Sequence, residues 1–279
     1  MKNKLLAIAF LTAIAFCTPG LAATEAIASC YHTKINAPTV PVALEIFLII
    51  DQTTLLDDQL KQSVANQLRP FLKAGNAFSV LVFSAFTQGR YTQLVTSGQL
   101  DHPLPAGQRN DVSKPLLSRF DQCMSRQTAL AAQAVGGALR TAFGESSGDI
   151  AKSDVLASLK DISGKVRQSQ ASEKVVLLVS DMLENSSISS FYAGQSVRRI
   201  DPERELKTAT DSQLTGDFGG ARIYVLGAGL LSDDARKLKA AYRDPKTMQA
   251  LASFWKLYFE KSKAKLVEFG QPALLNQIK

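Results

Sequence analysis

The feature that most constrains the fold is the nearly continuous apolar run VALEIFLII at residues 42–50. Such a run is typical of a central strand covered on both faces, because a strand with one exposed face alternates apolar and polar residues. After a polar turn, the stretch 55–73 carries leucine or valine at every fourth position, which predicts a helix with one apolar stripe. Strand, turn and helix in this order form half of a βαβ unit.

The same alternation continues along the chain. Further strands are expected at 78–86, 174–179, 222–226 and 265–269, with an antiparallel edge strand at 91–95, and further helices at 125–143, 150–166, 232–242 and 245–263. This order predicts an α/β fold with a doubly wound, mostly parallel, Rossmann-like sheet, one antiparallel edge strand and helices on both faces. The polar stretch between Asp181 and Gly220 is too long for a plain connection, so we expect it to be functional or partly helical.

The last long helix has a broad aromatic face. Its large apolar side chains recur at helical spacing and are Leu251, Phe254, Trp255, Tyr258 and Phe259. A helix that covers a sheet needs such a face, so we expect these side chains in the core.

The amino terminus has the order of a secretory signal. Two lysines precede an apolar run at 5–16, and helix breakers and small residues follow up to Ala23. The run is shorter than the roughly 20 apolar residues that span a bilayer, so we expect cleavage after Ala22 or Ala23 and no transmembrane span in the mature chain. The expected organisation is a signal peptide at 1–22, an N-terminal arm at 23–41 and one α/β domain at 42–279. The mature protein is expected to be periplasmic or secreted.

The charge balance and the cysteines narrow the class of protein further. The chain has 32 Lys and Arg against 25 Asp and Glu, without basic runs interleaved with aromatic residues, so nucleic acid is not an expected partner. Only Cys30 and Cys123 remain after the signal is removed. An exported protein with two cysteines is expected to join them in a disulfide.

Polar residues follow two of the expected central strands. Asp51, Thr53 and Thr54 come after the first strand, and Ser180 and Asp181 come after the strand at 174–179. The carboxyl ends of parallel strands meet at one edge of a sheet, where ligands bind. Two carboxylates with hydroxyls suit magnesium, calcium or manganese, whereas either aspartate alone could simply cap a helix or turn.

This order of elements resembles the von Willebrand factor A-type domain over residues from about 42 to 270. The likeness is carried by a strand ending Asp51-x-Thr53, a hairpin edge, two helices and a strand ending Ser180-Asp181. That family binds a divalent cation through an Asp-x-Ser-x-Ser motif, a threonine from a later loop and an aspartate after the fourth strand. The family uses the metal to bind a carboxylate of its partner.

Carrying the motif over residue by residue gives an incomplete metal site. Leu55 stands at the second serine position and offers no ligand, and the threonine role falls on Thr128, or on Ala134 in a different alignment. The resemblance therefore implies a possible Mg²⁺, Ca²⁺ or Mn²⁺ site formed by Asp51, Thr53, Thr128 and Asp181.

The expected function is a non-enzymatic module that binds a protein partner in the cell envelope. The partner-binding residues implied by the resemblance are Thr54, Ser180, Ser186 and Ser187. Catalysis is not expected, since the chain has no Gly-x-Ser-x-Gly or phosphate-binding loop and only His32 and His102 as mature histidines. Two alternatives stay open: a metal-assisted hydrolase that uses Asp51 and Asp181, and a structural component of an envelope or secretion assembly.

Overall fold

The computed structural model describes residues 27–31, 35–84, 92–146, 153–193, 196–230 and 244–279. The expected signal peptide at 1–22, the expected helix at 232–242 and His32 lie outside the described residues. Within the described ranges, no helix is both long enough and apolar enough to cross a membrane.

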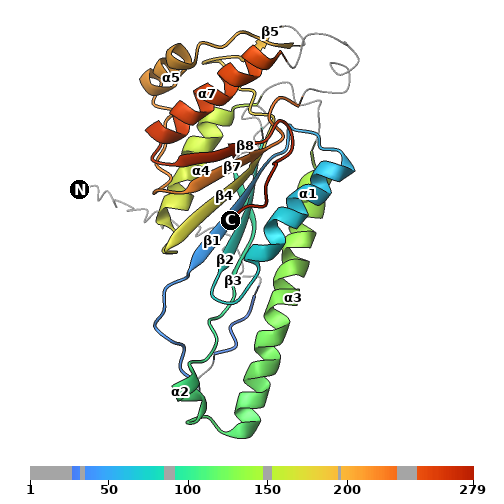
Figure 1. The fold of residues 1–279 in the computed structure, drawn as a ribbon, viewed down its shortest axis with the longest axis vertical. Helices are drawn as coiled ribbons and strands as arrows, with labels where there is room; N and C mark the ends of the chain where they lie inside the picture. The colour runs from blue at the N-terminus through green and yellow to red at the C-terminus, as the bar shows by residue number, and fades with distance from the viewer. Residues whose placement is uncertain (1–26, 32–34, 85–91, 147–152, 194–195, 231–243) are drawn as a thin grey trace, which may run out of the picture.

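The core of the molecule is a six-stranded sheet in the order β3-β2-β1-β4-β7-β8 (Figure 1). Its strands are β1 (Leu44–Asp51), β2 (Ala77–Phe83), β3 (Gln93–Gln99), β4 (Glu173–Val179), β7 (Arg222–Leu226) and β8 (Lys265–Phe269). All neighbouring pairs are parallel except β2 and β3, which are antiparallel. The expected α/β class, with one antiparallel edge strand, is confirmed.

Helices cover both faces of the sheet (Figure 1). The long helices are α1 (Asp58–Leu68), α3 (Lys114–Gly144), α4 (Val155–Gln168), α5 (Pro202–Asp211) and α7 (Pro245–Lys261). One buried cluster joins the sheet to α1 and α3, and a second joins the opposite face to α4 and α7. The fold is therefore doubly wound, and β1 is buried from both sides as its apolar sequence predicts.

Four helices begin at an aspartate that caps the first turn. Each of these side chains accepts a hydrogen bond from the backbone N–H three residues further along the chain. The residues are Asp57, Asp154, Asp201 and Asp244, ahead of α1, α4, α5 and α7. Such caps satisfy N–H groups that have no partner inside the helix. The chain thus fixes the helix starts that surround the carboxyl edge of the sheet.

Several element boundaries differ from the sequence-based expectation. Helix α3 starts at Lys114 rather than 125, because Pro115 sits in its first turn, where proline is compatible with a helix. Strand β2 ends at Phe83, and β3 begins at Gln93 instead of 91. The long polar stretch is partly helical, as expected, and holds α5 and a separate two-stranded sheet of β5 (Tyr192–Ala193) and β6 (Ser196–Val197).

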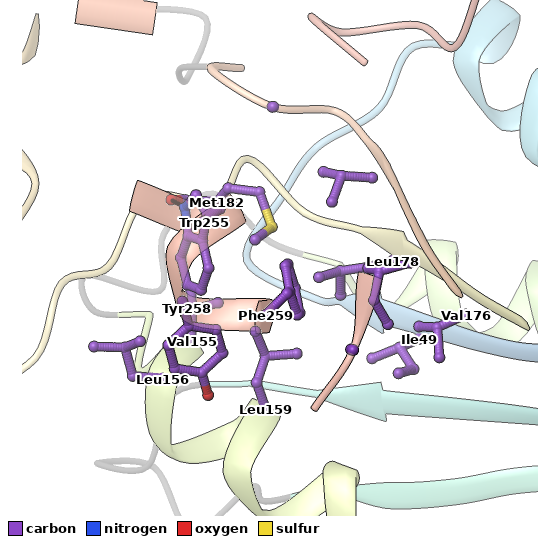
Figure 2. Close-up of a cluster of buried hydrophobic side chains, with 14 of the residues drawn as sticks. Ile49, Val155, Leu156, Leu159, Val176, Leu178, Met182, Trp255, Tyr258 and Phe259 are labelled. Atoms are coloured by element: carbon purple, nitrogen blue, oxygen red, sulfur yellow. Dashed lines mark hydrogen bonds between the residues drawn. The ribbon is translucent and has the colours of Figure 1, made fainter. Parts of the chain in front are cut away.

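The aromatic face of α7 is buried as predicted. Leu251, Phe254, Trp255, Tyr258 and Phe259 are all fully shielded from solvent. Figure 2 shows Trp255, Tyr258 and Phe259 packed among side chains of α4 and the sheet. The indole Nε1 of Trp255 also donates to the backbone oxygen of Met182 at 2.9 Å, so α7 supports the loop that leaves β4.

A third, smaller cluster of buried residues lies at the far end of α3, below the sheet in Figure 1. We call it the disulfide lobe; it joins the N-terminal arm, the connection after β3 and the first half of α3, with Cys30, Ile35, Leu104 and Phe120 at its centre. The expected disulfide between Cys30 and Cys123 is present, with an S–S distance of 2.08 Å. It fastens the N-terminal arm to α3.

Removing this disulfide should destabilise the protein. The bridge spans a sequence separation of 93 residues, and the chain-entropy model assigns a loop of that length about 4 to 5 kcal/mol. We expect the double variant Cys30→Ser, Cys123→Ser to unfold at a clearly lower urea concentration. Wild-type protein in reductant should match the variant. Two free thiols in the mass spectrum of the unreduced chain would contradict the bridge.

Candidate functional site

Asp51 ends β1 at the point where the strand order reverses. The chain runs from β1 outward to β2 and β3, then returns to β4 on the other side of β1. The carboxyl ends of β1 and β4 therefore flank the topological switch point, the usual binding position in open α/β sheets. Asp51 is the last residue of β1, and Asp181 lies two residues after the end of β4.

The carboxylate of Asp51 is fully buried and accepts four hydrogen bonds. Its Oδ1 accepts from the backbone N–H of Thr53 at 2.9 Å and from the Thr53 hydroxyl at 2.6 Å. Its Oδ2 accepts from the hydroxyls of Ser180 at 2.8 Å and Ser153 at 3.3 Å. Three hydroxyls from three segments are thus oriented by one carboxylate.

The ends of β1 and β4 are also joined directly. The backbone N–H of Asp181 donates to the Thr54 hydroxyl at 3.0 Å, and the backbone N–H of Met182 donates to the Ser180 hydroxyl at 3.0 Å. Thr54 and Ser180 are both buried. These two hydroxyls therefore hold the backbone of the site in place, and neither lies on the surface.

Asp181 is less fully bonded than Asp51. Its Oδ1 accepts from the backbone N–H of Leu183 at 2.8 Å, and its Oδ2 accepts, among the residues that the structure describes, only the hydroxyl of Tyr192, at 3.3 Å. Its backbone oxygen accepts from the N–H of Gly229 at 2.9 Å. The turn after β7 is thus packed against Asp181, and Gly227 must be glycine because its φ is 105° and a Cβ would lie 3.0 Å from the Ser180 oxygen.

The two aspartates interact electrostatically. Burial raises the pKa of Asp51, while the bonds from Thr53, Ser180 and Ser153 oppose the shift. Burial raises the pKa of Asp181 well above its usual value of 3.8, and the charge of Asp51 raises it further. No ion pair with Lys or Arg reaches either carboxylate in the described part of the chain. The pair therefore retains a proton to higher pH than isolated aspartates would.

One predicted metal ligand lies elsewhere. Thr128 is exposed in the middle of α3, whereas α3 approaches the site only at its C-terminal end, where Glu145 accepts a 3.1 Å bond from the Gln52 side chain. At 1.5 Å per residue, Thr128 is about 25 Å back along the helix from Glu145. The hydroxyl that enters the site from the segment before α4 is Ser153.

The predicted partner-binding serines occupy a turn beyond β4. The Ser186 backbone N–H donates to the Ser189 oxygen at 2.9 Å, and the Ser186 hydroxyl accepts from the Ile188 N–H at 3.2 Å. Ser187 and Ile188 are exposed at this turn. Ser189 anchors it, since its hydroxyl donates to Glu205 at 2.7 Å.

Three residues of the site were not predicted. Ser153, Tyr192 and Glu184 lie in segments that lack the apolar periodicity of a helix or a strand. Their places in the site depend on contacts that form only in the folded chain. The one available signal was the clustering of Ser180, Asp181 and Glu184 directly after a buried strand.

The site offers a divalent cation few free oxygen ligands. An ionised carboxylate offers about four acceptor positions, and the four bonds to Asp51 fill them. The carboxylate of Asp181 accepts two bonds from the described part of the chain, so this carboxylate and the hydroxyls that Asp51 orients are the oxygens left for a hard cation. Leu55, with 39% of its surface exposed, contributes none. No cluster of three or more His, Cys, Asp or Glu suited to a metal occurs in the ranges that the structure describes.

Comparison with known proteins adds little to this geometry. No protein-family model matches the chain, and the search of curated proteins finds no match. Among solved structures, one match is an aerotolerance-related membrane protein from Bacteroides fragilis that carries multiple mutations to serine. The match covers 82% of this chain and 92% of that one, at 10% identity and a TM-score of 0.33. A likeness of this size does not establish a family.

Glu184 lies buried behind the turn, at the N-terminus of α4. Its Oε2 accepts from the Leu156 N–H at 2.9 Å, while Oε1 has no hydrogen-bond partner among the described residues. Burial raises the pKa of Glu184 to about 8. The nearby Ser186 hydroxyl and the Leu156 amide oppose this shift, although Ser186 is not in hydrogen-bonding position to Oε1.

Replacing Glu184 should change how stability depends on pH. Between about pH 4.5 and 8 the unfolded chain ionises this carboxyl while the folded chain keeps it protonated, so stability falls as pH rises. We expect Glu184→Gln to unfold like wild type near pH 4 and to be more stable by roughly 2 to 4 kcal/mol at pH 8. Urea denaturation across this range measures the difference. The exposed Glu260→Gln is the control, and parallel pH profiles for Glu184→Gln and wild type would refute the assignment.

Proposed function

We propose that this chain is an exported, von Willebrand A-like module that binds a protein partner at the carboxyl edge of its sheet. The observation that carries the proposal is the meeting of Asp51 and Asp181 at the switch point, buried and without an ion pair in the described residues. Ionising both buried carboxyl groups is unfavourable in the ligand-free protein. Such a pair is favourable where a cation or a positively charged group completes it.

In this proposal the completing group is a divalent cation, with Mg²⁺, Ca²⁺ and Mn²⁺ as the candidates. Asp181 would hold it together with the Thr53 and Ser153 hydroxyls, and Asp51 would orient those hydroxyls. The cation supplies a positive charge that can attract a carboxylate of the partner. Because cation binding displaces the proton that the aspartates retain, affinity should increase as pH rises.

The proposed contact surface surrounds the acidic pair. Thr54 and Ser180 are buried, so they stabilise the site without contacting the partner. In this proposal the partner contacts the Ser186–Ser187 turn and the exposed apolar side chains beside it. Leu55 follows Thr54 directly, and Ile188 lies in the turn with 46% of its surface exposed. An apolar rim around a desolvated charge is a favourable arrangement for protein binding.

Export is supported by the disulfide and the leader sequence. Disulfides persist in oxidising compartments and are rare in the cytoplasm, so the Cys30–Cys123 bridge fits a periplasmic or secreted protein. We propose a mature chain with an N-terminal arm at 23–41, fastened by the bridge, and one α/β domain at 42–279.

A cation titration tests the site. We expect Mg²⁺, Mn²⁺ or Ca²⁺ to raise the melting temperature of the mature protein, since binding only to the folded state adds about 2.7 kcal/mol at a hundredfold excess over Kd. Asp181→Asn should abolish the shift, and chelator should reverse it in wild type. Asp161→Asn, an exposed aspartate on α4, is the matched control. An identical shift in wild type and Asp181→Asn would contradict the site.

Partner capture tests the interaction. Immobilised mature protein should retain a specific component of envelope extract in the presence of Mg²⁺ and release it in chelator. We expect Asp181→Asn to lose that component and Asp161→Asn to keep it. If wild type and Asp181→Asn capture the same set of proteins, binding does not pass through the acidic pair. If the protein hydrolyses a phosphoester from a test panel and Asp181→Asn abolishes this activity, the hydrolase alternative would be favoured instead.

A further inference from the structure

Tyr192 lies over the least protected atom of the acidic pair. It is the first residue of β5, which pairs only with β6 in a two-stranded sheet separate from the main one. Its hydroxyl donates to Asp181 Oδ2 at 3.3 Å, longer than the 2.7 to 2.8 Å typical of hydroxyl donors. The contact is therefore weak enough to exchange for a better ligand.

The base of this hairpin is firmly attached. Phe191 is fully buried and makes edge contacts with Phe254 at 5.1 Å and Trp255 at 6.4 Å between ring centroids. Arg198 stacks over the Phe191 ring at 5.6 Å and forms a 2.7 Å ion pair with Glu205. These contacts fix Phe191 and Arg198 on either side of the hairpin. We therefore expect the Tyr192 side chain, and not the hairpin base, to move when a ligand binds.

The bonding pattern of the two aspartates singles out one atom. Asp51 has its acceptor positions filled, and Asp181 Oδ1 is bound to the backbone N–H of Leu183. Among the described residues, Asp181 Oδ2 accepts a bond from the Tyr192 hydroxyl alone, and Asp181 is 6% exposed. Oδ2 is therefore the carboxylate oxygen of the pair that a ligand is best placed to bind, and Tyr192 occupies it.

We propose that Tyr192 is a gating residue: its hydroxyl holds Asp181 Oδ2 in the ligand-free protein and leaves that atom when a cation binds. This inference rests on the proposed cation site. The hydroxyl satisfies the buried carboxylate in the absence of ligand and so competes with the cation for the same atom. Tyr192 then sets the threshold of cation binding without serving as a ligand.

The test compares wild type with Tyr192→Phe, which keeps the ring and removes the hydroxyl. Mn²⁺ binding is followed by the electron paramagnetic resonance signal of the free ion, a readout that does not depend on protein stability. We expect Tyr192→Phe to bind Mn²⁺ about 2- to 10-fold more tightly, the equivalent of one competing hydrogen bond. Tyr31→Phe, which removes a hydroxyl bonded to the His102 backbone oxygen in the disulfide lobe, should bind like wild type.

Mn²⁺ binding that is equal or weaker in Tyr192→Phe would overturn the gate while leaving the cation site standing. Absence of Mn²⁺ binding in both proteins would overturn the cation site and the gate together.

Discussion

The hydrogen bonds to the Asp51 carboxylate are the interactions on which the carboxyl edge of the sheet depends. This carboxylate lies at the end of β1, a central strand buried from both faces, and accepts bonds from Thr53 after β1, Ser153 before α4 and Ser180 after β4. A buried carboxylate is stable only when such bonds replace water. The same bonds therefore fix the relative positions of two strands and a helix start. The geometry around Asp181 follows from that framework.

The central strands could be predicted from sequence because they are buried. Strand β7 matches the expected range and β4 starts one residue earlier, because continuous apolar runs have sharp ends in the sequence. Strand β8 also matches its expected range, although it is a partly exposed edge strand. The start of α3 was missed since its first turns pack on the disulfide lobe, and the small core there has no clear apolar period in the sequence.

The candidate site was predictable to the extent that it follows from sheet topology. Asp51 and Asp181 meet because the ends of neighbouring parallel strands meet, and the strand pattern alone implies this. Ser153 lies 102 residues from Asp51 in the chain and enters through the loop before α4, which no local pattern positions. Thr128 was assigned from a motif alignment along a helix whose length and register the sequence left open. Contacts between irregular segments depend on tertiary packing and could not be predicted from the sequence.

The length of α3 sets the distance between the disulfide lobe and the acidic edge of the sheet. Its 31 residues rise about 45 Å, from the disulfide lobe at one end to the neighbourhood of Gln52 at the other (Figure 1). A single helix of this kind is stiff along its axis, so the spacing between the lobe and the acidic edge is set by the backbone and changes little with side-chain packing. The disulfide lobe and the acidic edge are therefore two separate surfaces, held apart at opposite ends of the same helix.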